Sequence, residues 1–436
     1  MQNKHFFYII LANFFWSIVP ILASDLFRFT SIIMVAFQRF FISGIFLFFL
    51  ALFLAIYNNK HKKREKIPIG QLLRLVLEKN EDFSNFRFFM YFLLLGFFGI
   101  ILHIFGYFFA LKLTSISFAL VGFQLSIIII AFYEHGVRLE NLDIFKTLYL
   151  VILIFCVIII SYIKFQDPSQ TYISSSIIGW IYIVLFAVCV SFLHIGISKD
   201  TYTSKEVNLI NKNKDFKIIR MLIKLSLIFI LGFIPLIPFM LIFYFFPIEL
   251  NLHNEIVLFF SEFSNFFNIL FDWRMVLLIV FSTIIPYTLM FISNVNWSPY
   301  NLTYSQWISI LTIIEPIFSL ILGIIFIGEY FPLEFLIIVT FLLIISILLR
   351  YAHETKNKVN AYILLNLRQG LLDSIPIQLL KLSGVCCVQS LIGTHDLLLN
   401  IKTNSIKDIY KLINKEIRKI DGIENLDILF IDKINK

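Results

Sequence analysis

The chain has 436 residues, of which 59% are hydrophobic and only 15% are charged, and its formal net charge is +8. A soluble globular protein carries about 25% charged residues, so this composition excludes an ordinary soluble fold for most of the chain. The basic residues stand mostly in two loops and the tail, which argues against nucleic-acid binding, and the four scattered cysteines (Cys156, Cys189, Cys386 and Cys387) have neither metal-ligand spacing nor the pattern of a disulfide framework.

Apolar runs of about 20 residues, the length that crosses a bilayer as a helix, recur along the chain. The first run lacks the short apolar core and small-residue cleavage site of a secretory signal, so we expect it to be retained. The predicted spans are residues 5–23, 31–57, 87–111, 115–133, 144–163, 176–197, 219–246, 275–296, 302–327 and 333–350. We therefore expect an all-α polytopic membrane protein with ten transmembrane helices, whose principal partner is the lipid bilayer.

The distribution of basic residues predicts the orientation. The loops at 58–86 and 198–220 follow even-numbered spans and hold seven and six Lys or Arg residues, whereas the loops after odd-numbered spans hold four in all. Because cytoplasmic loops are enriched in Lys and Arg, both termini are expected in the cytoplasm of a multi-pass protein of the cell membrane.

The longest loop on the predicted outer side covers residues 247–274. Its apolar residues recur at helical spacing and predict an amphipathic helix that lies on the outer membrane surface; they are Phe259, Phe260, Phe263, Phe266, Phe267, Leu270 and Phe271. Two roles remain open for this helix, membrane anchoring and gating.

The predicted spans divide into two sets of five, residues 1–165 and 175–351. Each set closes with an apolar run and a glutamate, followed by a short break, Leu-Glu and another span; the glutamates are Glu134 and Glu329. Because five is an odd number, the two halves would face opposite ways across the membrane. Inverted repeats of this kind are the architecture of many secondary transporters.

The order of these motifs resembles the EamA type of the drug/metabolite transporter superfamily. The resemblance rests on "NFFWSIVPILA" in the first span, "IIMVAFQRFFISGIFLF" with Arg39 in the second, "GYFFALKLTSISFAL" between the third and fourth, and "YSQWISILTIIEPIFSLILGIIFIGEY" in the ninth. It implies a transporter of small organic solutes built from ten helices. The fourth span is shorter than its counterpart in the second half, so its share of a central site stays open.

The ninth predicted span carries one polar face. On a continuous helix its small and polar residues would share an arc of about 120°; they are Ser305, Ser309, Thr312, Glu315, Pro316, Ser319 and Gly323. A charged side chain at mid-membrane costs about 2.5–3.5 kcal/mol, so such residues turn toward a bundle interior or a watery cavity. Pro316 has no N–H to give the Thr312 carbonyl, which we expect to be free for a neighbour, water or substrate.

Each polar residue inside a span has a functional and a structural interpretation. Glu315 could line a central cavity and exchange a proton, or it could hold spans together by hydrogen bonds. Arg39 could bind an anionic group or tie the second span to a neighbour. His103 and His194 could shuttle protons or be packed and neutral. The remaining candidates for lining a cavity are Tyr107, Gln124, Tyr287, Asn294 and Trp307.

Enzyme motifs are absent from the sequence. No phosphate-binding glycine loop, His-Glu-x-x-His motif or nucleophile elbow occurs. We therefore expect no enzyme activity and no cofactor or metal, and transport that runs on gradients or downhill.

Residues 355–436 differ in character and predict a separate cytosolic domain. Alternation over 359–367 indicates a half-buried strand, and further strands are predicted at about 385–392, 396–402 and 423–431. Helices are predicted at Pro376–Leu382 and at 406–421, the second with an isoleucine face. The order is the split βαβ of ferredoxin-like folds.

The tail, with "LIGTHDLLLNIKT" and "INKEIRKIDGIENLDILFI", resembles the effector-binding domain of Lrp/AsnC-type regulators. The resemblance implies homodimerisation through residues 355–436, with amino-acid sensing as an open second role. The turn Gly393-Thr394-His395-Asp396 is the candidate ligand or dimer contact. No DNA-reading helix-turn-helix is present, so no nucleic-acid partner is expected.

Together these features favour a secondary transporter, an exporter of small metabolites such as amino acids, which alternates access around a central cavity and is regulated or dimerised by its tail. The alternative is a membrane receptor whose helices or tail bind an amino-acid-like ligand without transport.

Overall fold

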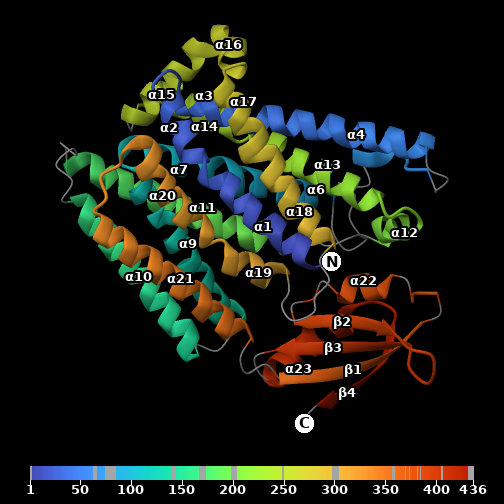
Figure 1. Ribbon diagram of the computed structural model, residues 1–436. Helices are drawn as coiled ribbons and strands as arrows, with labels where there is room; N and C mark the ends of the chain where they lie inside the picture. The colour runs from blue at the N-terminus through green and yellow to red at the C-terminus, as the bar shows by residue number, and fades with distance from the viewer. Residues whose placement is uncertain are drawn as a thin grey trace.

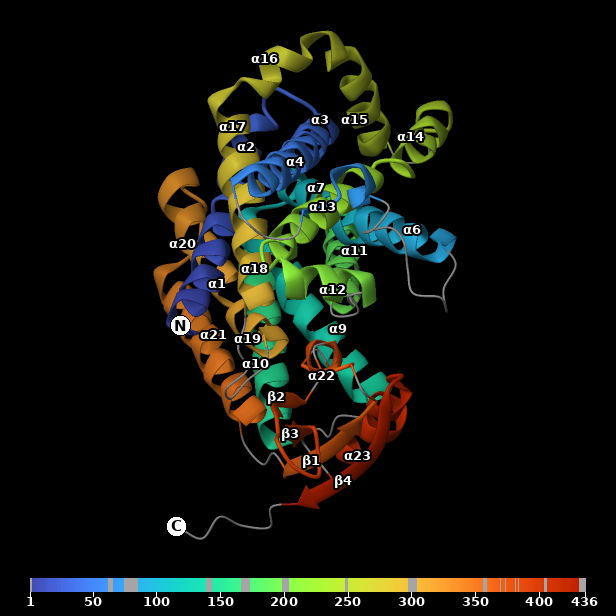
Figure 2. The same cartoon turned by 90° about the vertical axis from the view of Figure 1, so that its right-hand side faces the viewer.

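A helical bundle with a small sheet at one end makes up the molecule (Figure 1). The computed structural model describes residues 2–61, 66–73, 85–138, 143–165, 173–197, 204–247, 250–296, 304–355, 359–368, 370–372, 374–380, 382, 384–403 and 406–430. In both views the sheet lies at the end of the bundle opposite helices α15 (Leu250–Ser261) and α16 (Phe266–Leu270) (Figures 1 and 2).

Eight helical stretches in the described residues are long and apolar enough to cross a membrane. They are Lys4–Leu26, Ile32–His61, Phe89–Leu113, Ile116–Tyr133, Ile144–Lys164, Phe216–Phe245, Trp273–Ser293 and Leu333–Thr355. Two further apolar stretches, Ile177–Leu193 and Ile314–Ile327, are shorter and fall where the sixth and ninth spans are predicted. The chain is thus a mostly helical, multi-pass membrane protein, and the count of ten spans stays a prediction.

Most spans are composed of more than one helical element. The α-helices of the bundle are α1 (Gln2–Ser17), α2 (Val19–Leu26), α3 (Ile32–Phe37), α4 (Ser43–His61), α6 (Asn85–Leu94), α7 (His103–Leu113), α8 (Ile116–Ala119), α9 (Val121–Arg138), α10 (Ile144–Phe165), α11 (Ile173–Ile197), α12 (Ser204–Lys212), α13 (Phe216–Leu231), α14 (Leu236–Phe245), α17 (Trp273–Ile279), α18 (Ile285–Asn296), α19 (Tyr304–Leu311), α20 (Ile314–Ile327) and α21 (Leu333–Thr355). Three spans contain π-helical turns, which are η1 (Gln38–Ile42), η3 (Leu95–Leu102) and η5 (Val280–Ile284), and a short 3₁₀ turn, η2, covers Ile69–Gln71.

The most extensively packed helix pairs of the bundle are α10 with α21, α7 with α11, α4 with α13, α9 with α11, and α1 with α18. At another contact, between η3 and the end of α13, glycines let the two backbones approach closely. A Cβ on Gly96 would lie 2.3 Å from the Ile228 carbonyl oxygen, and one on Gly232 would lie 2.6 Å from the Gly96 carbonyl carbon. Small residues at such crossings are typical of membrane helices, whose association depends on close packing rather than on the hydrophobic effect.

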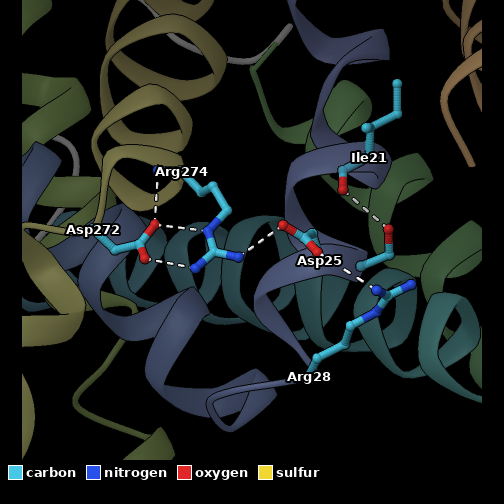
Figure 3. Close-up of polar contacts among 6 residues, drawn as sticks. Ile21, Asp25, Arg28, Asp272 and Arg274 are labelled. Atoms are coloured by element: carbon cyan, nitrogen blue, oxygen red, sulfur yellow. Dashed lines mark hydrogen bonds and ion pairs between the residues drawn. The ribbon is translucent and has the colours of Figure 1, made fainter.

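The loop predicted to form one amphipathic helix is divided in the structure. A 3₁₀ turn, η4 (Glu262–Asn265), separates α15 from α16. The aromatic residues are therefore spread over two short helices with different directions (Figure 2). Beside them, the Arg274 guanidinium bridges Asp272 and Asp25, each at 2.7 Å, and Asp25 also faces Arg28 at 3.9 Å (Figure 3).

The C-terminal domain is a four-stranded antiparallel sheet with two helices. Its elements are β1 (Val359–Leu367), α22 (Ile375–Leu379), β2 (Val385–Ser390), β3 (Leu397–Thr403), α23 (Ile406–Lys415) and β4 (Ile423–Phe430), and the strand order is β2-β3-β1-β4. Alternate residues of β1 and β3 are buried in a core of their own. The predicted helix over 406–421 is too long, because α23 ends at Lys415 and a 3₁₀ turn, η6 (Ile417–Lys419), follows it.

Candidate functional site

Arg39 lies in the π-helical turn η1 and is 2% exposed. Its Nε donates to Thr283 Oγ1 at 2.7 Å, and its Nη2 donates to the Ser282 carbonyl at 2.9 Å. Both partners belong to η5, another π-helical turn. A π turn adds one residue to a helical turn and recurs at functional sites. Two such turns therefore present the guanidinium and its acceptors to each other.

One arm of the guanidinium stays free. Arg39 Nη1 is buried and has no hydrogen-bond partner among the described residues. The Phe40 and Phe108 rings lie 4.9 and 5.9 Å from the guanidinium carbon, so the charge is surrounded by aromatic faces. The two hydrogen bonds support the interpretation that Arg39 ties the second span to a neighbour. The Nη1 group without a described partner is compatible with the other interpretation, that Arg39 binds an anionic group.

Three of the other predicted residues gather around this arginine. Tyr107 from α7, Tyr287 from α18 and Glu315 from α20 each interact electrostatically with Arg39, and both tyrosines also interact with Glu315. The Tyr107 hydroxyl is buried and has no hydrogen-bond partner within the described part of the chain. The Tyr287 ring packs against Trp16 with a 5.3 Å centroid distance.

Glu315 stands at the start of a helix, because the ninth span is broken. Helix α19 ends at Leu311, α20 begins at Ile314, and Glu315 lies in the first turn of α20. A helix N-terminus favours negative charge, and Pro316 is tolerated in a first turn, where its missing N–H is not needed. The continuous polar face predicted for this span is therefore interrupted, and the side chains of Ser305 and Ser309 lie outside the described residues.

The expectation of a free Thr312 carbonyl is wrong. The Glu315 N–H donates to it at 3.3 Å, so a tighter 3₁₀-type bond replaces the one that Pro316 cannot make. The Thr312 hydroxyl donates to the Ile308 carbonyl at 2.7 Å. Further along α20, the Ser319 hydroxyl donates at 3.4 Å to the carbonyl of Ser17, where the first span breaks between α1 and α2. Helix α20 thus contacts the first span at the break of that span.

The Glu315 carboxylate is not tied to the bundle by hydrogen bonds. The residue is 5% exposed, and its carboxylate makes no hydrogen bond or ion pair with any side chain or backbone group that the structure describes. The structural interpretation of Glu315, in which hydrogen bonds hold spans together, therefore has no support in this part of the chain. The Glu315 carboxyl group and the Arg39 guanidinium are both buried and interact electrostatically, but they are not directly paired.

Other predicted residues lie apart from this cluster. His103 Nδ1 is 3.0 Å from the Gly99 carbonyl of its own helix, and its ring stacks on Phe186. Trp307 packs edge-to-face against Phe6 in a separate apolar cluster. Gln124 is buried, and neither of its amide atoms has a hydrogen-bond partner among the described residues. The side chains of His194 and Asn294 lie outside the described residues.

The sequence did not predict a buried ion pair at the edge of this region. Lys164 Nζ, at the end of α10, lies 2.9 Å from Glu329 Oε1, and it also donates to the Tyr330 carbonyl at 3.0 Å. The Ser117 N–H donates to both Glu329 oxygens at 3.2 Å. Gly328 ends α20 in the left-handed region, at φ 70°, and turns Glu329 toward the bundle. Glu329 also interacts electrostatically with Tyr107.

The predicted turn of the tail is held by its own backbone. Asp396 Oδ2 accepts from the Leu367 N–H at 2.7 Å, and the Asp396 N–H donates to the Leu365 carbonyl at 2.9 Å. His395 Nε2 lies 3.3 Å from Asp427 Oδ2. Gly393 and Thr394 are near the exposed tip, so the turn is ordered by strand contacts, and its ligand or dimer role stays a prediction. Within the described residues, no group of three His, Cys, Asp or Glu side chains could hold a metal ion.

Comparison with known proteins bears on the first half of the chain. No curated protein matches the chain. A solved structure, titled only "Crystal structure of protein", is similar over 82% of this chain and 100% of its own, with 13% sequence identity and a TM-score of 0.45. Residues 3–162 match the model of the EamA-like transporter family. This match supports the resemblance of this part of the chain to the drug/metabolite transporter superfamily.

Proposed function

We propose that this protein is a secondary transporter that exports small zwitterionic metabolites, such as amino acids, across the cytoplasmic membrane. The observation that carries the proposal is the buried guanidinium of Arg39 and the buried carboxyl group of Glu315, which interact electrostatically but are not directly paired. The Tyr107 hydroxyl and Arg39 Nη1 add two buried groups without partners in the described residues.

Such an arrangement is costly unless a ligand completes it. A buried polar group without a partner costs about 1–3 kcal/mol, and more if it is charged. A solute with a carboxylate and an ammonium group would accept from Arg39 and Tyr107 and donate to Glu315. Its apolar part would face the surrounding aromatic rings, which suits a small metabolite better than an inorganic ion.

The way the helices pair supports alternating access. If residues 1–165 and 175–351 are inverted repeats, the first span corresponds to the sixth and the third to the eighth. The observed pairs α1 with α18 and α7 with α11 are then equivalent contacts in the two halves. Arg39 and Tyr107 come from the first half, and Tyr287 and Glu315 come from the second. A site shared between two such halves can be opened to either side in turn.

Counterflow into proteoliposomes tests this function. Proteoliposomes that contain the full-length protein are loaded with each of the common amino acids in turn. At least one of these amino acids should exchange for its radiolabelled form outside. Glu315→Gln keeps the shape but removes the charge, so we expect a loss of flux of at least tenfold. The matched control is Glu334→Gln, which makes the same change at an exposed position of α21 and should leave the flux unchanged. Equal flux in the two variants and the parent protein would contradict the proposal.

The C-terminal sheet favours a second candidate function, that of a receptor. Its element order supports the split βαβ interpretation and, through the resemblance to Lrp/AsnC-type domains, homodimerisation and ligand sensing. A receptor would bind an amino acid without exchanging it. Counterflow with full-length protein and with a chain ending at Thr355, together with the molecular mass of each in lipid nanodiscs, separates these possibilities.

A further inference from the structure

The segment Leu250–Leu270, made of α15, η4 and α16, covers the end of the bundle that is opposite the sheet (Figures 1 and 2). We call it the outer segment. One side of it is apolar and open: Phe263, Phe267 and Phe271, the last just beyond its end, are exposed. Such a face is sufficient to anchor a helix at a membrane surface. Anchoring alone does not explain the acidic residues on its other side.

Glu255 connects the outer segment to two helices at once. Its Oε2 accepts from the Ile32 N–H, at the start of α3, at 2.7 Å. Its Oε1 forms an ion pair with Lys112, near the end of α7. The carboxylate is buried. Helix α3 leads directly into η1 and Arg39, and α7 carries Tyr107. One side chain therefore holds together the ends of the helix that leads to Arg39 and the helix that carries Tyr107.

Three further hydrogen bonds attach the outer segment to residues at the two ends of α3. Glu262 Oε2 accepts from Thr30 Oγ1 at 2.8 Å and from the Ser31 N–H at 2.9 Å. The Gln38 amide, beside Arg39 in the sequence, donates to the Phe266 carbonyl at 2.7 Å. The first N–H groups of a helix have no partner within the helix, and carboxylates satisfy them well. The segment thus caps α3 from outside and contacts the chain again at the residue before Arg39.

We propose that the outer segment is a lid on the transport path, and that Glu255 is the positioning residue that clamps it over α3 and α7. This inference rests on the proposed function, because it takes the Arg39 cluster as the solute site. Opening of this end requires α3 and α7 to separate, and Glu255 cannot keep both of its contacts when they do. Release of Glu255 therefore accompanies opening toward the side on which the lid lies.

Thiol labelling in membrane vesicles tests the lid without any solute. The four native cysteines are replaced by alanine, and Ser282→Cys serves as the reporter, because Ser282 is buried beside Arg39 and holds it only through its backbone carbonyl. The reagent is a membrane-impermeant methanethiosulfonate. Ser264→Cys, at an exposed position of the outer segment, shows on which side of the membrane the lid lies, and the reagent is applied there.

We expect Glu255→Gln to raise the labelling rate of the reporter at least tenfold, and Glu334→Gln, the matched exposed control, to leave it unchanged. Lys112→Met removes the ion pair but keeps the bond to Ile32, so it should give a smaller increase. If Glu255→Gln does not yield a monodisperse protein, the Lys112→Met result decides. An unchanged rate in the Glu255 or Lys112 variant, or an equal increase in the Glu334 control, would overturn the proposal.

The outcome separates the lid from the transport function. If no solute gives counterflow but Glu255→Gln still exposes the reporter, the lid stands and the transport proposal fails. If counterflow occurs and the labelling rate does not respond to Glu255 or Lys112, transport stands and the lid is only an anchor.

Discussion

Replacing Lys164 by methionine should expose the contribution of the buried ion pair with Glu329. The two side chains are 2% and 8% exposed, and their charged atoms are 2.9 Å apart. Removing one partner of a buried pair costs about 3–5 kcal/mol, because the other charge stays behind uncompensated. Glu329 would retain the Ser117 N–H, so we expect the lower end of the range, about 3 kcal/mol.

The double-mutant cycle isolates the pair. Glu329→Gln removes the carboxylate beside Lys164, which keeps its bond to the Tyr330 carbonyl, and should also cost about 3 kcal/mol. The double variant buries no unpaired charge, so it should be destabilised by less than the sum, with a coupling of about 2–3 kcal/mol. Unfolding in mixed micelles titrated with dodecyl sulfate measures each free energy.

A matched control is available nearby in Arg28, whose contact with Asp25 is 3.9 Å long and exposed (Figure 3). Arg28→Met should cost less than about 1 kcal/mol. Additive effects of the Lys164 and Glu329 substitutions, or a cost for Arg28→Met that equals that for Lys164→Met, would refute the reasoning from burial.

Three further predictions concern other regions. Arg39→Lys keeps the charge but cannot reproduce two hydrogen bonds and a free arm, so counterflow should fall at least tenfold in a folded protein; undiminished flux would exclude a specific role for the guanidinium. Gly96→Ala places a methyl group 2.3 Å from a facing backbone oxygen and should cost about 1–3 kcal/mol of unfolding free energy, whereas Gly70→Ala, with open space around it, should cost little; equal costs would contradict the close packing. The hydrogen bond with Arg274 holds the pKa of Asp272 below its usual 3.8, so this carboxylate stabilises the fold above that pH and the gain is lost as the pH falls through its folded pKa. Asp272→Asn should therefore lower the melting temperature at pH 7 but not at pH values below the folded pKa, and a deficit that persists in acid would argue for another cause.

The sequence predicted the spans well and their interruptions poorly. Runs of apolar residues carry the length signal of a bilayer, so eight of the predicted spans coincide closely with helices long enough to cross it, while the count of ten stays a prediction. The π turns that contain Arg39 and Thr283 add a single residue to a helix and change no hydrophobic period. Their contact joins residues 244 positions apart, and only folding brings them together. The sequence therefore identified Arg39 as a candidate but not its acceptors.

The same contrast holds for Glu315 in the ninth span: the sequence identified the residue but not its surroundings. Its position in an apolar run identified Glu315 as a candidate with a functional and a structural interpretation, since a mid-membrane charge needs a reason. A continuous helix was assumed, and the break before Ile314 replaced the free Thr312 carbonyl with a charge at a helix N-terminus. In the tail, alternation located β1 and β3 closely, because one face of each is buried. The regular spacing of the isoleucines predicted a helix that continues beyond Lys415. Helix α23 ends at Lys415, but the 3₁₀ turn that follows keeps Ile417 in the same core, so the spacing does not reveal the end of the helix.

The polar contacts at the lid end join the first half of the chain to the second. Opening this end therefore has a free-energy cost that can be compared with the free energy of solute binding. Lys112 pairs with Glu255, Lys164 with Glu329 and Asp25 with Arg274. Opening this end would break these contacts, at about 2–3 kcal/mol for the buried Lys164 pair and about 1 kcal/mol or less for each of the others where water can enter, which sums to at most about 4–5 kcal/mol. A solute that bridges the central charges would form two or three charge-assisted bonds of about 1.5–3 kcal/mol each. The two sums are of the same size, so a bound zwitterion can offset the opening of the lid end, and an empty site cannot.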